Sequence, residues 1–319
     1  MRLFHSYNSF IEAVYQEPSF DSPGTSIPND HGQCYENLNG KVRFASSFHY
    51  KYVNGKKTID GECYSAFFGT DNQIRHYERT DKDGTLVKAI TYLFDENGRC
   101  IEQITIDGRG EITSHTVHKY NEQGLLASSE YKSGGKNVYI YDSKGFLVEQ
   151  RWDSTSFENS WKELFINDEQ GREIEMKEYR GRYGSNDYWF SRKILTKYNE
   201  YGHIIERKNV ENSGKEKALS FDEYDDKGRV VKIGSSILTY DAHNRVKLVL
   251  NPDYNTSNHI LYDSDNSICI LWLNGNQVIT KKRKIVFDCY NNITSILYYE
   301  GEDLHLTMED KYVYEYYPE

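Results

Sequence analysis

The sequence has little proline and cysteine and no long apolar run, and each shortage narrows its possible structures. No stretch approaches the roughly 18 consecutive apolar residues that a membrane-spanning helix needs, so such a helix is excluded. Only five prolines occur, and none lies between Pro28 and Pro252. Because proline removes donors from a strand ladder, so long a proline-free stretch is typical of a continuous hydrogen-bonded sheet.

The cysteines give no sign of disulfide cross-links or of a metal site. The five cysteines are an odd number, are widely spaced, and include no CxxC pair. This pattern predicts neither a disulfide framework nor a zinc site, and it favours a reducing compartment. The N-terminus also lacks the apolar core of a signal peptide. We therefore expect a cytoplasmic protein, with secretion as the alternative if a leader precedes Met1.

Charge and aromatic content indicate the class of partner. There are 49 acidic and 39 basic side chains, a net charge of −10, and the entire excess lies in 61–319. A negative field disfavours nucleic acid and attracts a basic protein surface, although it also keeps the chain soluble. The 28 tyrosines raise the aromatic content to 14%, which argues against disorder.

A turn motif recurs along the chain. It consists of an aromatic residue, Asp or Asn, two variable residues and Gly or Asn, with an apolar side chain two positions later. Clear copies are Phe94-Asp95-Glu96-Asn97-Gly98, Tyr141-Asp142-Ser143-Lys144-Gly145 and Tyr224-Asp225-Asp226-Lys227-Gly228. The fifth position of the motif, the structural turn position, falls at Gly84, Gly98, Gly110, Gly124, Gly145, Gly171, Gly202, Gly228, Asn244 and Asn266.

The spacing of this motif predicts a β-hairpin. Asp or Asn accepts a hydrogen bond from the backbone two residues on. The next two residues form a type I turn, and Gly or Asn supplies the positive φ of a G1 bulge. The apolar residue two positions later then lies opposite the aromatic residue, and such cross-strand pairs stabilise sheets.

The repeats predict an all-β fold of antiparallel hairpins in a curled or spiralling sheet. About two dozen strands cannot lie in one flat sheet and must curl, fold over or close. We expect the hairpin-repeat domain to cover 61–319. Residues 1–60 are expected to form an irregular N-terminal cap, with a short amphipathic helix from Ser9 to Glu17 before a loop rich in Pro, Ser, Asp and Gly.

Two groups of segments carry a resemblance to a known repeat family. The copies at 94–99, 141–145 and 224–230 resemble the YD repeats of bacterial Rhs-type proteins, and the segment 141–171 is similar to YD-like repeats of Bacteroidetes proteins. The resemblance covers roughly 65–295. It implies a spiralling β-strip, which in full Rhs proteins forms a shell around a toxin. This chain is too short for a closed shell, so a smaller open sheet with a curved binding face is expected.

The sequence predicts no catalytic residue, no metal site and no cofactor. No nucleophile elbow, HExxH or paired-carboxylate signature occurs. His115 and His118 are three apart in a predicted strand, so their side chains point to opposite faces. The run Lys281-Lys282-Arg283-Lys284 is interpreted as an edge strand protected by lysines, with contact to phosphate or an acidic partner as the alternative.

The best candidate site lies where the repeat lengthens and the tryptophans gather. Long loops with aromatic and Arg side chains are typical of binding hot spots, although packing of these rings in longer hairpins is the alternative. We predict that this region forms the longest hairpins. Its partner-binding residues are predicted to be Trp152, Trp161, Arg180, Arg182, Tyr183 and Trp189.

These features favour a non-catalytic protein-binding module. Repeat sheets offer extended surfaces that need no pocket. The family resemblance implies an immunity or adaptor protein of a bacterial toxin system. The acidic charge favours a basic toxin domain as partner and disfavours nucleic acid, and without a long apolar run we expect no contact with membrane. One alternative is a carbohydrate-binding protein or glycan-acting hydrolase, because aromatic rings stack on sugars. The other is a structural fragment of a larger Rhs-like shell.

Overall fold

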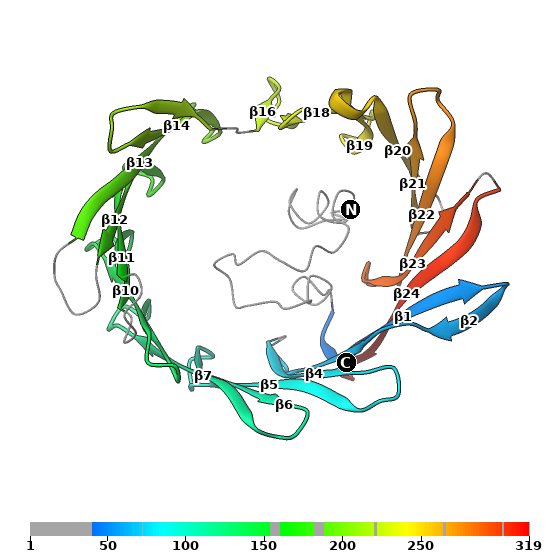
Figure 1. Cartoon of the computed structure of the whole chain (residues 1–319), viewed down its shortest axis with the longest axis horizontal. Coiled ribbons are helices and arrows are strands. Elements are labelled where there is room, and N and C mark those ends of the chain that lie inside the picture. Colours follow the sequence, from blue (N-terminus) through cyan, green and yellow to red (C-terminus); the bar gives the residue numbers. More distant parts are fainter. Residues whose placement is uncertain are drawn as a thin grey trace. The chain divides into compact units, whose positions relative to one another are not determined.

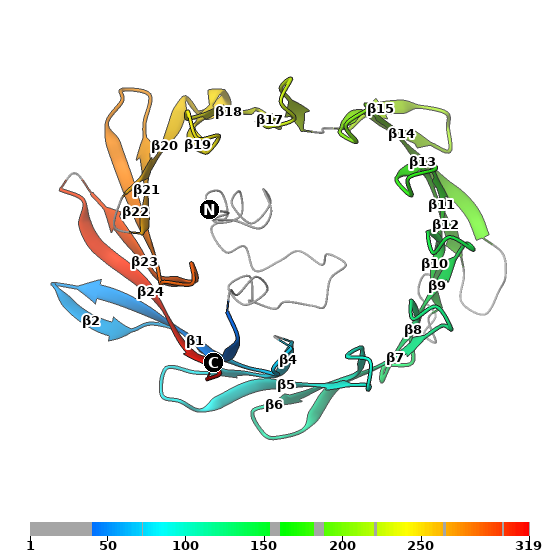
Figure 2. The ribbon, with the colours of Figure 1, turned by 180° about the vertical axis from the view of Figure 1, so that it is seen from behind.

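The computed structural model describes residues 40–71, 73–153, 160–181, 188–219, 222–263, 266–301 and 303–318. Within these residues the chain forms 24 β-strands and one short 3₁₀ turn, η1 (Pro252–Tyr254). The strands follow one another as successive antiparallel hairpins (Figures 1 and 2). The predicted all-β class of antiparallel hairpins is therefore confirmed. The chain divides into two compact units, one made of residues up to Ala89 and from Thr239 onward, the other of Ile90–Leu238.

The first unit joins early and late parts of the sequence through strand β1 (Val42–Val53). Strand β1 pairs with β24 (His305–Tyr316) and with β3 (Cys63–Phe68). Hairpin pairing then continues from β24 back to β19. The other strands wholly in this unit are β2 (Lys56–Ile59), β4 (Ile74–Thr80), β19 (Val246–Asn251), β20 (Thr256–Tyr262), β21 (Ser267–Leu273), β22 (Ile279–Phe287) and β23 (Ile293–Glu300).

The second unit is built from hairpins between neighbours in sequence. Hairpin pairing runs without crossover from β6 to β15 and from β16 to β18 (Ser236–Tyr240). Strand β18 contains the boundary after Leu238. Strand β5 (Leu86–Phe94) contains the boundary at Ala89. The remaining strands are β6 (Cys100–Asp107), β7 (Ile112–Tyr120), β8 (Leu126–Tyr131), β9 (Lys136–Tyr141), β10 (Leu147–Asp153), β11 (Ser160–Asn167), β12 (Glu173–Gly181), β13 (Tyr188–Tyr198), β14 (Ile204–Glu211), β15 (Glu216–Ala218), β16 (Glu223–Tyr224) and β17 (Val230–Ile233).

The turns have the geometry that the motif requires. At Gly98 φ is 75°. Asp95 Oδ1 accepts hydrogen bonds from the backbone N–H groups of Asn97 and Arg99, both at 2.9 Å. Across two such hairpins, Tyr141 lies opposite Leu147 and Tyr262 opposite Ile268. Positive φ occurs at Gly84, Gly98, Gly110, Gly124, Gly145, Gly171, Gly202, Gly228, Asn244 and Asn266.

Neighbouring repeats are connected through the motif's aromatic and basic side chains. The hydroxyl of Tyr120 donates to the carbonyl of Cys100 at 2.7 Å, and the guanidinium carbon of Arg99 lies 4.8 Å from the Tyr120 ring centroid. The same pair of contacts recurs at Tyr262, which donates to Val246 and is covered by Arg245. In these two copies the motif thus holds its own turn and also the ring of the next repeat.

Apolar burial is concentrated in the first unit. Among the largest fully buried side chains are Ile268, Ile270 and Ile285, on the neighbouring strands β21 and β22. Both units also bury polar side chains, and the second unit buries seven of the twelve found among the described residues. These seven are Thr105, Thr116, Ser128, Ser129, Ser160, Glu178 and Thr196. Burying a polar group costs free energy unless it is hydrogen-bonded, so these side chains add less to stability than apolar ones would.

The basic run on β22 is not on an edge, and the prediction of a protected edge strand was wrong. Strand β22 pairs with β21 on one side and β23 on the other. Its cations are accommodated by neighbouring side chains, because Lys281 pairs with Glu300 and Arg283 lies over the ring of Trp272. Aromatic neighbours thus allow a basic run inside a sheet.

The predicted N-terminal cap lies mainly outside the described residues, and so does its helix from Ser9 to Glu17. Of the segment 1–60, the structure describes 40–60, which contains β1 and β2. The boundary after residue 60 stays a prediction.

Candidate functional site

Four of the six predicted partner-binding residues lie in one line across the second unit. Trp152 on β10 is opposite Trp161 on β11, Trp161 is opposite Arg180 on β12, and Arg180 is opposite Trp189 on β13. Directly opposed residues share a face of the sheet. We call Trp152, Trp161, Arg180 and Trp189 the tryptophan row. Arg182 and Tyr183 lie outside the described residues.

The outer end of the tryptophan row is open to solvent. Trp189 is 51% exposed. The Arg180 side chain is 47% exposed. Trp161 and Trp152 are half-buried. The row therefore offers a wide apolar and cationic strip at one end of the β10–β11 and β12–β13 hairpins.

Trp152 is held in place by close packing. Its ring meets Tyr131 edge-on, with centroids 5.4 Å apart. The indole of Trp152 also packs against Gly135, where an added Cβ would come within 2.1 Å of the ring. Only glycine leaves room for the ring there. A tryptophan fixed in this way loses little conformational entropy on binding.

The line of opposed residues continues beyond Trp152 as polar side chains. Asn137 on β9 is opposite Trp152, and Ser129 on β8 is opposite Asn137. His118 on β7 follows, with its Nδ1 at 2.9 Å from Ser129 Oγ. Burial lowers the pKa of His118, so this end of the line is neutral at pH 7.

A second row of side chains lies beside the tryptophan row on the same face. It is displaced by two residues along β10, β11 and β12, and by three along β13, where a bulge adds one residue. Its opposed members are Gln150, Glu163, Glu178 and Arg192. We call these four the carboxylate row. Sequence reasoning missed it. The available signal was the alternation Trp161-Lys162-Glu163, which places an acid on the tryptophan face.

Glu178 is the fixed charge of the carboxylate row. Its side chain is only 5% exposed and bonds to two cations, Arg180 at 2.5 Å and Arg192 at 2.6 Å. Burying a charged carboxylate is costly unless cations pair with it in this way. Glu178 therefore orients Arg180 within the tryptophan row.

Glu163 differs from its neighbour. It is half-buried, and among the described residues its carboxylate has no hydrogen-bond or ion-pair partner. Burial raises its pKa, with Glu178 and Glu173 adding to the effect and Arg192 and Arg180 opposing it. Two adjacent carboxyl groups therefore occupy contrasting environments: Glu178 bonds directly to two arginines, and Glu163 bonds directly to none of the described residues.

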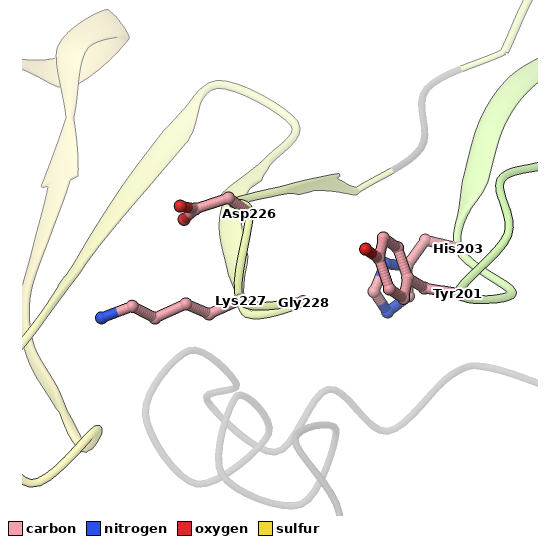
Figure 3. Close-up of a pocket in the computed structure, with 5 residues that line it drawn as sticks. All are labelled: Tyr201, His203, Asp226, Lys227 and Gly228. Atoms are coloured by element: carbon pink, nitrogen blue, oxygen red, sulfur yellow. The ribbon is translucent and has the colours of Figure 1, made fainter.

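A separate small pocket lies between two turns of the second unit. It has a volume of about 300 Å³ and is lined by Tyr201, His203, Asp226, Lys227 and Gly228 (Figure 3). The His203 ring stacks on Tyr224 at 3.9 Å between centroids, in the place that Arg occupies in other repeats. The stacking of His203 on Tyr224 connects two successive repeats, so the pocket is a by-product of repeat packing. The tryptophan row is therefore the stronger candidate site.

The described residues form neither a metal-binding cluster nor a membrane-spanning helix. In the described ranges no group of three or more His, Cys, Asp or Glu side chains could hold a metal ion. Nor does any helix among the residues placed in the structure have the length and apolar character to cross a membrane.

Comparisons with known proteins find similarity only among solved structures. No protein-family model matches this sequence, and no curated protein matches it. A Photorhabdus luminescens Tc holotoxin pore structure is 11% identical, with a TM-score of 0.42 over 76% of this chain and 14% of that one. A TcdB2-TccC3-TEV structure is also 11% identical, with a TM-score of 0.45 over 82% of this chain and 15% of that one.

A further match has a different description. A porin-like protein from Bacteroides uniformis is 8% identical, with a TM-score of 0.29 over 87% of this chain and 99% of that one. The chain spans about 15% of the length of the Tc toxin structures it matches. These similarities are too weak to assign an activity.

Proposed function

We propose that this chain is a non-catalytic protein-binding repeat module that contacts its partner through the tryptophan row. The observation that carries the proposal is the alignment of Trp152, Trp161, Arg180 and Trp189 on one face of four neighbouring strands. Trp and Arg are the side chains most enriched among interface hot spots. Neighbouring strands lie about 4.8 Å apart, so the row is about 15 Å long, a suitable size for an interface centre.

The partner is proposed to belong to a bacterial toxin system, where this chain acts as an immunity or adaptor protein. Two observations support this step. The repeats resemble YD repeats of Rhs-type proteins, and two of the matched structures are described as Tc toxin components. The excess of acidic side chains favours a basic partner domain, because opposite fields speed association.

The test is a capture experiment with a matched control. Tagged chain is incubated with lysate of the source organism, and retained proteins are quantified by mass spectrometry and then purified for binding measurements. The row variant carries Arg180→Ala and Trp189→Ala. The control variant carries Lys197→Ala and Tyr201→Ala, which removes an exposed cation and an exposed ring elsewhere in the same unit.

We expect the wild type and the control to retain the same protein and the row variant to bind it at least tenfold more weakly. Hot-spot truncations commonly cost 2 kcal/mol or more, which is about thirtyfold. Equal affinity of the row variant and the wild type for the purified protein would refute the proposal.

Carbohydrate binding is the second candidate function. It is favoured by three tryptophans on the same face as Gln150 and Glu163, which could accept and donate hydrogen bonds to sugar hydroxyls. Titration with soluble hexasaccharides tests it: saturable quenching of tryptophan fluorescence that the row variant loses would favour this candidate over the first.

A further inference from the structure

We infer that Glu163 is a receptor for a cationic side chain, an Arg or Lys that the partner inserts beside Trp161. This inference rests on the proposed function, because it specifies the chemistry of the partner at the same surface. It predicts a basic segment, rather than an acidic or a neutral one, at the centre of the interface.

The first argument is the position of Glu163. It lies two residues from Trp161 on β11, between Gln150 of β10 and Glu178 of β12. Side chains two apart on a strand stand on the same face. A cation that reached the Glu163 carboxylate would therefore lie within reach of an indole, a favourable combination of ion pair and cation–π contact.

The second argument is that Glu163 has no cation bonded directly to it among the described residues, although Arg192 and Arg180 act on it from a longer distance. Its neighbour Glu178 receives both Arg180 and Arg192, whereas among the described residues no cation bonds to Glu163. A half-buried carboxylate without a directly bonded partner is unfavourable. No hydrogen bond or ion pair to the described residues requires an acid at this position. A ligand that supplies the missing charge would remove the cost.

The charge balance favours a cation over an anion at this end of the row. The groups that act on Glu163 are Glu178 and Glu173, which hinder its ionisation, and Arg192 and Arg180, which favour it. The two arginines share their charge with Glu178 at 2.5 and 2.6 Å. An anionic ligand would meet Glu163 directly, whereas a cation would meet an acid and an aromatic ring.

This arrangement makes binding depend on pH. Burial raises the pKa of Glu163 in the unbound chain, and a bound cation would lower it again. Binding of the cation therefore releases a proton when it begins from the protonated acid. Affinity is expected to rise as the pH increases through the Glu163 pKa and to level off above it.

The experiment uses the full chain and three peptides, each carrying the same uncharged fluorescent label. The probes are Ac-GRGRGRG-NH2, the matched Ac-GEGEGEG-NH2, and Ac-GQGQGQG-NH2, and binding is followed by fluorescence anisotropy at pH 7.5 and pH 4.5. The variants are Glu163→Gln and, as the charge-matched control, Glu200→Gln in an exposed turn. We expect the Arg peptide to bind more tightly than the other two. Its affinity should fall about tenfold with Glu163→Gln, remain unchanged with Glu200→Gln, and fall at pH 4.5.

Three outcomes would overturn the inference: equal binding of the Arg peptide to wild type and Glu163→Gln, preference for the Glu peptide, or no binding of the Arg peptide. Failure here is distinguishable from failure of the proposed function. If the captured partner loses affinity for the row variant but not for Glu163→Gln, the row binds a protein and Glu163 is not its cation receptor. If neither variant affects the partner, the proposed function fails as well.

Discussion

Gly135 lies directly beneath the indole of Trp152, so close that a Cβ at that position would come 2.1 Å from the ring. The backbone of Gly135 does not have a positive φ, so the need for glycine arises from the indole alone. We therefore expect Gly135→Ala to displace Trp152 and to destabilise the chain by about 1–3 kcal/mol, as overpacking does. Urea unfolding measures this change.

The same substitution in a Trp152→Ala background is the control. There the space above Gly135 is open, and the cost of Gly135→Ala should fall below about 1 kcal/mol. An equal cost in both backgrounds would show that the indole does not depend on this glycine.

The contact between successive repeats predicts the effect of one hydroxyl. Tyr262 donates to the carbonyl of Val246 at 2.9 Å, and burial raises its pKa to about 12. Tyr262→Phe keeps the ring beneath Arg245 but leaves that carbonyl without this donor, which should cost about 0.5–1.5 kcal/mol. Tyr254→Phe, at an 81% exposed ring, should change the free energy of unfolding by less than about 0.5 kcal/mol. Similar effects of the two substitutions would contradict the role given to the Tyr262 hydroxyl.

Gln277 occupies a turn position that favours glycine. Its φ is 61°, and its N–H donates to the carbonyl of Asn274 as the motif requires. Because an L side chain in the left-handed region costs about 1 kcal/mol, Gln277→Gly should stabilise the chain by about 0.5–1 kcal/mol. Gln277→Ala controls for loss of the side chain and should not stabilise. A glycine variant that melts at or below the wild-type temperature would be inconsistent with this account.

Glu163 should make the chain less stable where it is ionised. Burial raises the pKa of Glu163 in the folded chain, so folding favours its protonated form. The resulting contribution to the free energy of unfolding is fully present below the unfolded-state pKa. It is lost as the pH rises through the folded-state pKa. Glu163→Gln is therefore expected to raise the melting temperature at pH 7.5 by about 2–4 °C, with little change near pH 3. A variant less stable than wild type at pH 7.5 would mean that the carboxylate has a stabilising partner.

The sequence predicted local structure well, because each turn is specified within about five residues. Asp95, Gly98 and their equivalents determine their own hairpins through backbone bonds and positive φ. Three turns without the full motif were not predicted, although they have the same backbone hydrogen bonds. The turns at Gly134 and Gly214 begin at Tyr131 and Glu211, without a leading Asp or Asn. The third turn ends on Gln277, where the motif has Gly or Asn.

Long-range features were not predictable in the same way. Pairing of β1 with β24 joins residues such as His49 and Asp310, which no local pattern connects. The tryptophan region was predicted from its composition, but its alignment depends on register over four strands. That register is set by the hairpins and by the bulges at Leu147/Glu149 and Glu178/Tyr179. The carboxylate row follows from the same register and therefore stayed hidden.

The central claim, that the tryptophan row contacts a protein partner, is tested most directly by fluorine NMR. The chain has four tryptophans, so 5-fluorotryptophan labelling gives four signals that Trp→Phe variants assign. On addition of the purified partner, we expect the signals of Trp152, Trp161 and Trp189 to shift or broaden. Trp272, on β21 of the first unit, should not change. Saturable binding of the partner that leaves the three row signals unchanged would contradict the account.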